Sequence, residues 1–416
     1  MEDKELIRLS KELKLKKFQF NSIYEFSSSL YSSFEIDSIV RIFFSTLMGQ
    51  MAISRIFFFD SGKKLFKERG CRFSDEELNA FRSAIRSIKE THFYLETDKL
   101  SADFSVLQDI LKEKKIRYLI NLSETRKKKI YLGLGYKFNR IKLSEEEIEF
   151  SFFIARFALI ALDNAVLINR IIENKRIEHE MKIAKDIQLS LLPQEIPELD
   201  HFEIAVIYQP INEVGGDYYD ILKDRDGRTS LLVADVEGKG LPAALLAASS
   251  QAVFHSLNEL YFFEPAKFVA KANSLIFNFT HGNRFITLLW LVVNDRKRSI
   301  TYVNAGHVEP FVISGRSVHS LNSGGFLTGF IPDAVYEKGN INLKPGDVLV
   351  AFTDGVPEVS NRSNEEFGRK GLIDLVKSHR HLSVRDLTEV VFSEIKRHSD
   401  GRRFHDDFTL LLLKAR

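Results

Sequence analysis

Four aspartates in the second half of the chain share a setting that could support chemistry. Each stands at or beside the end of an apolar run typical of a strand, next to glycine or another acid: Asp217, Asp235, Asp354 and Asp406. A carboxylate at the end of a buried strand is costly to remove from water unless positive charge compensates it. Because an aspartate beside glycine is most often a turn residue that bonds its own backbone, the hypothesis of a site depends on all four together.

Hard divalent cations would compensate such a group of carboxylates. Mg²⁺ and Mn²⁺ favour octahedral sites made of carboxylate oxygens and water. Two such ions about 3.5–4 Å apart can share a water, lower its pKa and hold a phosphoryl group for in-line attack. Spacing along the chain does not bring the four aspartates together, so the two-ion site is a prediction about the fold.

The elements that would position these aspartates are short buried strands. Strands are predicted over 202–208, 230–236, 286–293, 299–304, 310–313, 347–353 and 408–413. Helices are predicted over 243–257, 265–279, 371–378 and 384–396. Because the strands outnumber the helices and most are continuous apolar runs, we expect sheets packed on each other with helices outside.

Seven motifs in this region, taken in order, resemble the PPM family of metal-dependent Ser/Thr phosphatases, in its bacterial RsbU/SpoIIE-type branch. The motifs are AKDIQLSLLP at 184–193, GGDYYD at 215–220, DVEGKGLPAA at 235–244, FITLL at 285–289, NAGH at 304–307, TDGVPE at 353–358 and DDFTL at 406–410. The resemblance implies an α+β fold, an αββα sandwich of two antiparallel sheets over 199–416, with two Mn²⁺ or Mg²⁺ ions at one end.

The resemblance also implies a set of metal ligands. They are Asp217 for the first ion, Asp235 and the backbone carbonyl of Val236 between the ions, and Asp354 and Asp406 for the second. Asp407, beside a ligand, supports it through hydrogen bonds or, if the register differs by one, is itself the ligand.

The sequence departs from the family pattern at three places. Glu237 stands where this branch usually has serine, and no histidine follows the bridging Asp235 closely enough to act as general acid. His307 or a metal-bound water could protonate the leaving serine oxygen instead, while the alternative for His307 is a structural role in the turn after 304–306. No arginine is an obvious clamp for the substrate phosphate.

The first part of the chain predicts a separate α+β domain. Residues 54–60 and 129–142 have the patterns of strands, a helix over 75–89 follows Ser74 as N-cap, and Ser144 with Glu147 predicts a capping box that opens a long helix. The segment 18–164 resembles a GAF-type sensor domain at 132–138, at this acidic helix start and at 158–165. A PAS-like sensor is the alternative, and no ligand-binding residue carries over.

A helix is predicted to connect the two domains over 165–198. No glycine or proline interrupts 161–192, and Pro193 and Pro197 would end the helix. Its apolar seam consists of Ile177, Met181, Ala184 and Leu191. This seam fits a dimeric coiled coil, or an amphipathic helix packed on one of its own domains.

Composition excludes several classes of function. A length of 416 residues indicates two domains, and a net charge of +2 gives no field that would favour nucleic acid or a membrane. Cys71 is the only cysteine, so neither a disulfide framework nor a thiolate cluster can form within the chain, and a reducing cytoplasm is expected. We expect no membrane span, because no apolar run approaches the roughly 20 residues required.

These features together predict a metal-dependent serine/threonine phosphatase regulated by an N-terminal sensor domain. By resemblance, its substrate is a phosphorylated anti-anti-sigma protein of the STAS type, and a homodimer is expected. Without a usable cysteine, attack by a metal-activated water is the expected mechanism. The alternatives are an inactive scaffold that binds the same partner, and a hydrolase of nucleotides or other small phosphoesters.

Overall fold

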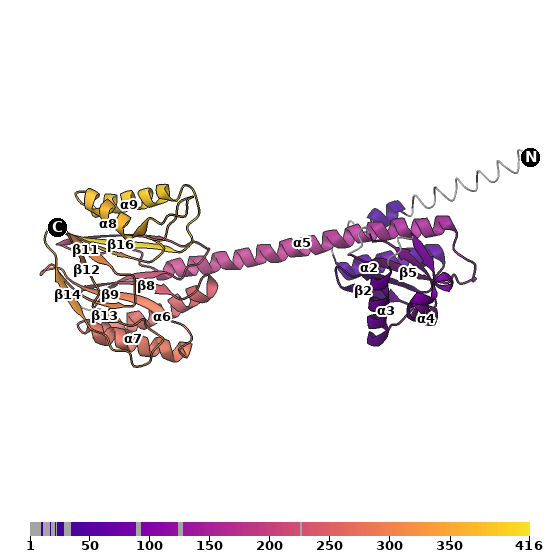
Figure 1. Cartoon of the computed structure of the whole chain (residues 1–416), viewed down its shortest axis with the longest axis horizontal. Coiled ribbons are helices and arrows are strands. Elements are labelled where there is room, and N and C mark those ends of the chain that lie inside the picture. Colours follow the sequence, from indigo (N-terminus) through magenta and orange to yellow (C-terminus); the bar gives the residue numbers. More distant parts are fainter. Residues whose placement is uncertain are drawn as a thin grey trace, which may run out of the picture. The chain divides into compact units, whose positions relative to one another are not determined.

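The computed structural model describes residues 35–88, 93–123, 128–224 and 227–416, with a few positions before residue 35 (10, 17, 21 and 23–28). The chain divides into two compact units, Met1–Arg176 and Ile177–Arg416 (Figure 1). The division falls inside helix α5, Glu145–Leu191. The predicted domain limits at 164 and 198 lie on either side of this division and stay predictions.

The N-terminal unit is built on a five-stranded antiparallel sheet of order β2-β1-β5-β4-β3. Its strands are β1 (Ile56–Asp60), β2 (Leu65–Arg69), β3 (Tyr94–Glu96), β4 (Ile116–Asn121) and β5 (Ile130–Gly135). Its helices are α2 (Ile36–Met51), α3 (Asp75–Ser87), α4 (Ser105–Glu113) and the first half of α5, with two 3₁₀ turns, η1 (Thr97–Lys99) and η2 (Ala102–Phe104).

Alternation along β1 gives this sheet two buried faces. Phe58 packs in a core with residues of α2 and α5, whereas Phe57 and Phe59 pack in a second core with residues of α3 and α4. Among the described elements, the sheet therefore has α2 and α5 on one face and α3 and α4 on the other, and the predicted α+β class of this unit is confirmed.

The sequence predicted where helices begin more accurately than where strands end. The capping boxes of Ser74 with Glu77 and of Ser144 with Glu147 are both present. The strand predicted over 129–142 was too long, because β5 ends at Gly135 and Phe138 is 75% exposed. Beyond residue 135, Lys137 forms an isolated bridge with Ile53, and the N–H of Phe138 donates to the carbonyl of Ala52 (3.0 Å), so this segment pairs with the loop before β1 and not with a strand.

The C-terminal unit contains two sheets. The first has the order β13-β10-β9-β8-β7, with β14 paired to β10, and the second has the order β12-β11-β15-β16-β6. The strands are β6 (Phe202–Gln209), β7 (Tyr218–Lys223), β8 (Thr229–Val236), β9 (Ile286–Asn294), β10 (Ser299–Ala305), β11 (Phe311–Ser314), β12 (Ser317–Ser320), β13 (Gly324–Gly325), β14 (Gly339–Asn342), β15 (Val348–Phe352) and β16 (Phe408–Ala415). The helices are α6 (Leu241–Tyr261), α7 (Pro265–Thr280), α8 (Gly368–His379) and α9 (Val384–His398).

Three apolar layers hold this unit together. Leu231 and Val233 of β8 face the second sheet and pack with its Leu411 and Leu413. The alternate β8 residues face α6 and α7, while the outer face of the second sheet packs on α8 and α9. The predicted αββα sandwich is confirmed (Figure 1).

Every strand and helix predicted in this unit is present, but four short strands were missed. β7 (YYDILK) mixes aromatic and charged residues with apolar ones, so it lacks a continuous apolar run. The strands β12, β13 and β14 have two to four residues each and are too short to show a hydrophobic period. Gly324–Gly325 pairs in parallel with Asn304 and Ala305, so this sheet is not antiparallel throughout.

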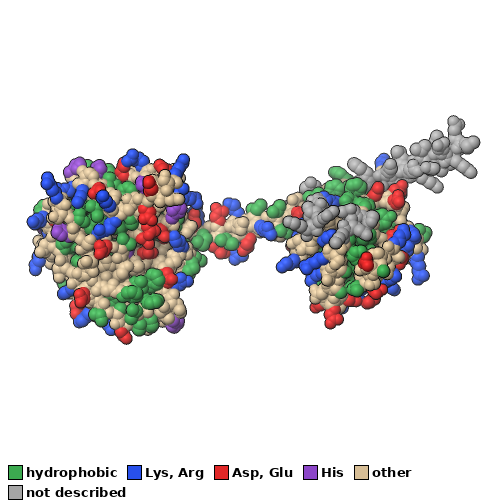
Figure 2. Space-filling model, in the orientation of Figure 1, with side chains coloured by type: hydrophobic (Ala, Val, Ile, Leu, Met, Phe, Trp, Pro, Cys, Tyr) green, Lys and Arg blue, Asp and Glu red, His purple; other side chains and the backbone are tan. Residues whose placement is uncertain are grey.

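Helix α5 is continuous, as its sequence predicted. Among the described residues it is the one helix long and apolar enough to cross a membrane by length and composition, and 39% of its most apolar window is buried inside the protein. Ile154, Ala158 and Leu162 pack in the core of the N-terminal unit, as in a core helix. Further along, α5 exposes apolar and charged side chains together (Figure 2). The expected absence of a membrane span stays a prediction.

Candidate active site

The four aspartates stand at strand ends that the two sheets bring to one end of the sandwich. Asp217 directly precedes β7, and Asp235 is the second-last residue of β8, whose end pairs with the start of β7. Asp354 follows β15, and Asp406 precedes β16, whose start pairs with the end of β15. Hydrogen bonds between the sheets show that these two pairs of ends adjoin.

Asp217 carries the clearest of these bonds. Its Oδ2 accepts hydrogen bonds from the hydroxyls of Thr353 (2.7 Å), directly after β15, and of Thr409 (2.5 Å) in β16, both on the side of the other sheet. Asp217 is 3% exposed, and both threonines are fully buried. The two hydroxyls fix the position of the carboxylate and leave its second oxygen available to a ligand.

Asp407 organises the loop that carries Asp217. Its Oδ1 accepts the backbone N–H of Ile211 (2.8 Å), and its Oδ2 accepts the N–H groups of Gly216 (2.6 Å) and Asp217 (3.4 Å). This is the geometry of the supporting role predicted for Asp407. A Cβ on Gly215 would lie 2.6 Å from the same Oδ2, so glycine is needed for the close approach.

The carboxylates influence one another electrostatically. Burial, followed by the negative charges of Asp354 and Asp406, raises the pKa of Asp235 to about 7. Burial and the charge of Asp235 raise the pKa of Asp217 well above its usual value, and burial and Asp406 raise the pKa of Asp354. Four acids of one site thus share an excess of negative charge.

Two cationic side chains lie at the rim of this cluster. Lys239 donates from its Nζ to Asp406 Oδ2 (2.6 Å) and to the carbonyl oxygen of His405 (2.9 Å). A guanidinium nitrogen of Arg284 would lie 3.5 Å from a Cβ placed on Gly238. The single charge of Lys239 does not neutralise the acids behind it, so the all-oxygen donor set fits hard divalent cations.

His307 lies beside the cluster but is buried. It is 5% exposed, and its Nδ1 is 2.8 Å from the hydroxyl of Thr287, which also lies 3.5 Å from the carbonyl oxygen of Asp235. Burial lowers the pKa of His307 to about 4. Its backbone N–H donates to the side chain of Asn304 (2.8 Å), so the structure favours the alternative role of His307 in the turn.

The backbone carbonyl of Val236, expected as a metal ligand, lies next to the loop that carries Asp217. Its carbonyl oxygen would lie 3.1 Å from a Cβ on Gly216, which places it next to the Asp217 loop. Glu237 stands directly after it, half-buried, with its N–H bonded to the carbonyl of Phe285. The structure gives Glu237 no carboxylate contact that would explain its departure from serine.

Sequence reasoning missed the groups that support the aspartates. These groups lie within or next to the seven motifs: Thr353, Thr409, Thr287, Lys239 and Arg284. In the sequence, only their position beside an aspartate or a strand end could have indicated a role. Hydrogen bonds across the two sheets depend on the packing, which no local pattern encodes.

A second acidic group lies elsewhere in the unit. Oxygen and nitrogen atoms of Asp200, His201 and Asp295 lie within 4.8 Å of one another. Both oxygens of Asp295 already accept backbone N–H groups, from Asp200 (3.0 Å) and His201 (2.9 Å). This group therefore holds a turn in place.

Comparisons with known proteins agree with the fold and the motifs. The family model of Stage II sporulation protein E (SpoIIE) matches residues 225–416. Phosphoserine phosphatase RsbU of Bacillus subtilis is 30% identical over 244 residues, which cover 58% of this chain and 72% of RsbU. Phosphoserine phosphatase RsbP of the same organism is 23% identical over 244 residues, 58% of each chain.

A solved structure shows the same fold. The SiaA-PP2C domain of Pseudomonas aeruginosa superposes with a TM-score of 0.53 and 20% identity, over 58% of this chain and 98% of that domain. From the order of its motifs, its fold and its relation to RsbU, the chain belongs to the SpoIIE-type, RsbU-like family of PP2C-fold serine/threonine phosphatases.

Proposed function

We propose that the chain hydrolyses phosphoserine or phosphothreonine in a partner protein, with two Mn²⁺ or Mg²⁺ ions held by its C-terminal unit. The observation that carries the proposal is that Asp217, Asp235, Asp354 and Asp406 stand at adjoining strand ends. Burial, followed by the charges of neighbouring acids, raises the pKa of three of them. The carbonyl of Val236 would complete the ligand set.

Divalent cations bound there would supply the positive charge that activates a water for attack and holds the phosphoryl oxygens. The chain's own residues prepare the site. Thr353 and Thr409 fix Asp217, Asp407 fixes the loop before it, and Asp235 lies among the other acids. Preorganised groups of this kind need no rearrangement as charge develops in the transition state.

Lys239 and Arg284 would attract the phosphate of the substrate. Lys239 is half exposed at the rim, and Arg284 is exposed beside Gly238. Lys239 donates to Asp406, and Arg284 adds a second positive charge beside Gly238, so an incoming phosphate would not meet only negative charge.

A covalent phosphocysteine is not part of the proposed mechanism. Cys71 belongs to the N-terminal unit and is 3% exposed. Burial raises the pKa of its thiol to about 11, so the nucleophilic thiolate is scarce at neutral pH. Direct attack by water on the phosphorus atom follows.

The partner and the regulation are proposed at the level of the whole protein. RsbU and RsbP are named phosphoserine phosphatases; by resemblance, the substrate proposed here is a phosphorylated anti-anti-sigma protein of the STAS type. The N-terminal unit would be a GAF-like sensor in a cytoplasmic homodimer, with α5 connecting it to the phosphatase unit.

The test is phosphate release by the purified full chain. Phosphorylated STAS proteins from the same genome, free nucleotides and p-nitrophenyl phosphate are supplied in turn, with Mn²⁺, with Mg²⁺ and with EDTA. We expect metal-dependent release that is fastest on a phosphoprotein. Faster hydrolysis of nucleotides would replace the protein substrate by a small phosphoester, and binding of the phosphoprotein without release would indicate a scaffold.

A further inference from the structure

The N-terminal unit contains a cavity of about 400 Å³ whose wall is strongly basic. Its lining residues are Phe59, Ser61, Lys64, Arg82, Ile85, Arg86 and Lys129. Four of these are cationic and none is acidic. The volume is in the range of small-molecule sites in proteins.

In the part of the chain that the structure describes, the four cations have no carboxylate partner. Lys129 donates from its Nζ to the carbonyl oxygen of Ile88 (2.7 Å), and Arg82 donates to the amide oxygen of Asn79 (3.4 Å). Within the described ranges, neither they nor Lys64 nor Arg86 forms an ion pair. A concave site with four unpaired positive charges attracts anions.

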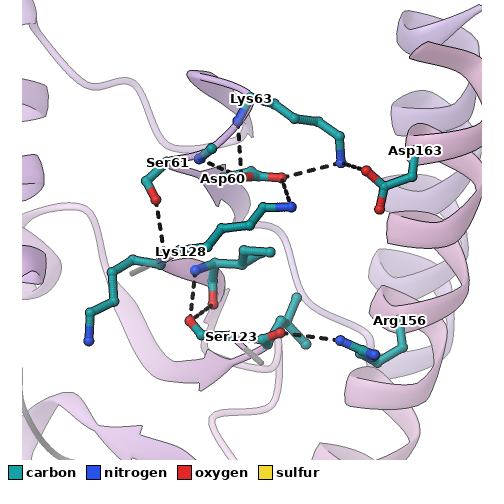
Figure 3. Close-up of polar contacts among 11 residues, drawn as sticks. Asp60, Ser61, Lys63, Ser123, Lys128, Arg156 and Asp163 are labelled. Atoms are coloured by element: carbon teal, nitrogen blue, oxygen red, sulfur yellow. Dashed lines mark hydrogen bonds and ion pairs between the residues drawn. The ribbon is translucent and has the colours of Figure 1, made fainter. Parts of the chain in front are cut away.

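Among the described residues, the acid next to the cavity-lining turn is Asp60, which has other partners. Asp60, at the end of β1, is fully buried, and its oxygens accept the N–H groups of Gly62 (2.8 Å) and Lys63 (3.2 Å). It also pairs with the Nζ atoms of Lys63 (3.3 Å) and Lys128 (3.6 Å) (Figure 3). The charge of Asp60 is therefore compensated by these two lysines, which do not line the cavity.

Ser61 adds a neutral donor to the cavity. Its Oγ accepts the backbone N–H of Lys129 (2.9 Å), so the hydroxyl hydrogen can be donated to a ligand. The C-terminal turns of α3, which carry Arg82 and Arg86, oppose an anion through the helix dipole. That dipole amounts to about half a negative charge, much less than the four cations supply.

We propose that this cavity binds a compact polyanion, a small molecule with several phosphate or carboxylate groups, held by Lys64, Arg82, Arg86 and Lys129. Guanidinium groups form paired hydrogen bonds with both kinds of oxyanion. Phe59 and Ile85 form the apolar part of the wall. The proposal is independent of the phosphatase chemistry.

The turn beside the cavity also contacts helix α5. Lys63, between Ser61 and Lys64, forms an ion pair with Asp163 of α5 (2.6 Å), and Figure 3 shows this lysine reaching from the turn to the helix. Arg156 of α5 donates to the carbonyl oxygen of Leu122 (3.4 Å), near the strand that brings Lys129 to the cavity. An anion that moves the turn would thus act on α5 through Lys63.

Calorimetric titration of the full chain tests the binding site. Protein stripped of metal on a chelating resin, so that no free polycarboxylate remains in solution, is titrated with pyrophosphate and with citrate. Without metal ions, the negative charge of the four aspartates in the phosphatase unit repels both anions. We expect one site per chain, and the tighter of the two anions identifies the phosphate or the carboxylate class. The double variant Arg82→Gln/Arg86→Gln is expected to weaken binding at least about tenfold.

The matched control changes two basic residues of the same unit that do not line the cavity. Arg41→Gln/Lys112→Gln removes the same charge from exposed helix positions and should leave the affinity unchanged. Equal weakening in both double variants, or no binding of either anion at millimolar concentration, would overturn the proposal. If circular dichroism shows that the arginine variant is unfolded, Lys64→Gln on the turn replaces it.

Hydrogen exchange tests the link to α5. Anion binding should change exchange at residues 156–165 in the starting chain but not in Lys63→Met, which does not remove a cavity residue. Asp60 keeps Lys128 as a partner in this variant. Unchanged exchange on binding would restrict the proposal to the site itself and exclude this route.

Discussion

At the scale of single residues, the site depends on groups that hold the aspartates rather than on the aspartates alone. Asp217 shows this most clearly, since two threonines of the opposite sheet bond one of its oxygens. Burial and Asp235 raise its pKa, and the hydroxyls of Thr409 and Thr353 act in the opposite direction. Hydrogen bonds to a ligand's second oxygen tune its affinity for a cation.

We therefore predict that Thr353→Val weakens Mn²⁺ binding about 10- to 100-fold, the range found when groups that support a metal ligand are lost. The measurement is a Mn²⁺ titration of phosphate release, supported by calorimetry. Thr388→Val, which also removes a buried hydroxyl but from α9, serves as control. Equal Mn²⁺ affinity in both variants would show that the hydroxyl of Thr353 has no such role.

A second residue-scale prediction concerns His255. Its hydrogen bond to Asp220 (2.8 Å) raises its pKa above 6.5. The folded chain thus holds this proton more tightly than the unfolded chain. The pair contributes stability that is complete below pH 6.5 and is lost as the pH rises through the raised pKa. Because the histidine side chain is 46% exposed, the contribution is at most about 1 kcal/mol.

Urea unfolding of wild type and His255→Ala between pH 5.5 and about 8.5, a range that brackets an unperturbed histidine, measures this difference. Fluorescence of Trp290, the single tryptophan, reports on the C-terminal unit. The difference should shrink with rising pH, and His319→Ala, on the exposed β12, should show none. A difference that grows with pH would refute the assigned protonation.

At the scale of elements, the sequence predicted most of what builds the site. The apolar runs located β8, β9, β15 and β16, and the motifs located the turns after β8 and β15 and before β16. β7 and β8 follow each other in the sequence, and their pairing was missed because β7 itself was not predicted. The pairing of β15 with β16 was not predictable, because it depends on contacts between residues far apart in sequence. For the same reason the bonds from Thr353 and Thr409 to Asp217 could not be foreseen.

A prediction at this scale concerns the close backbone contact between the turn after β15 and the turn before β16. A Cβ on Gly355 would lie 1.9 Å from the carbonyl oxygen of Asp407, so Gly355→Ala must displace one of the two turns. We expect a loss of about 1–3 kcal/mol in stability, as for other overpacked sites, together with a loss of phosphatase activity.

Thermal unfolding and phosphate release check this. Gly371→Ala in α8 is the control, because its Cβ would meet only the ring of Phe367 at 3.4 Å, an ordinary contact. If Gly355→Ala were as stable and active as Gly371→Ala, the two turns would not require their close approach.

At the scale of the whole molecule, the chain has separate cores. The N-terminal sheet packs between two apolar clusters of its own, and the C-terminal sandwich has three others. The sequence predicted this division from length and patterning. The identity of the N-terminal unit as a sensor was inferred from resemblance alone and stays a proposal.

Separate cores predict that the chain does not unfold in a single two-state transition. Calorimetry should show two transitions, and Trp290 fluorescence should follow only one of them. The anion proposed for the N-terminal cavity should raise the other transition temperature, because it binds only the folded unit. One transition seen equally by both probes would contradict the independence of the units.

The most direct test of the account is the number of Mn²⁺ ions that the metal-free chain binds. Equilibrium titration followed by electron paramagnetic resonance should give two ions per chain, with spin coupling between them, and Asp235→Asn should lose that coupling and phosphate release together. Asp374→Asn, on the exposed face of α8, should retain both. Two coupled ions and full activity in Asp235→Asn, or no Mn²⁺ bound by the wild-type chain, would contradict the proposed centre.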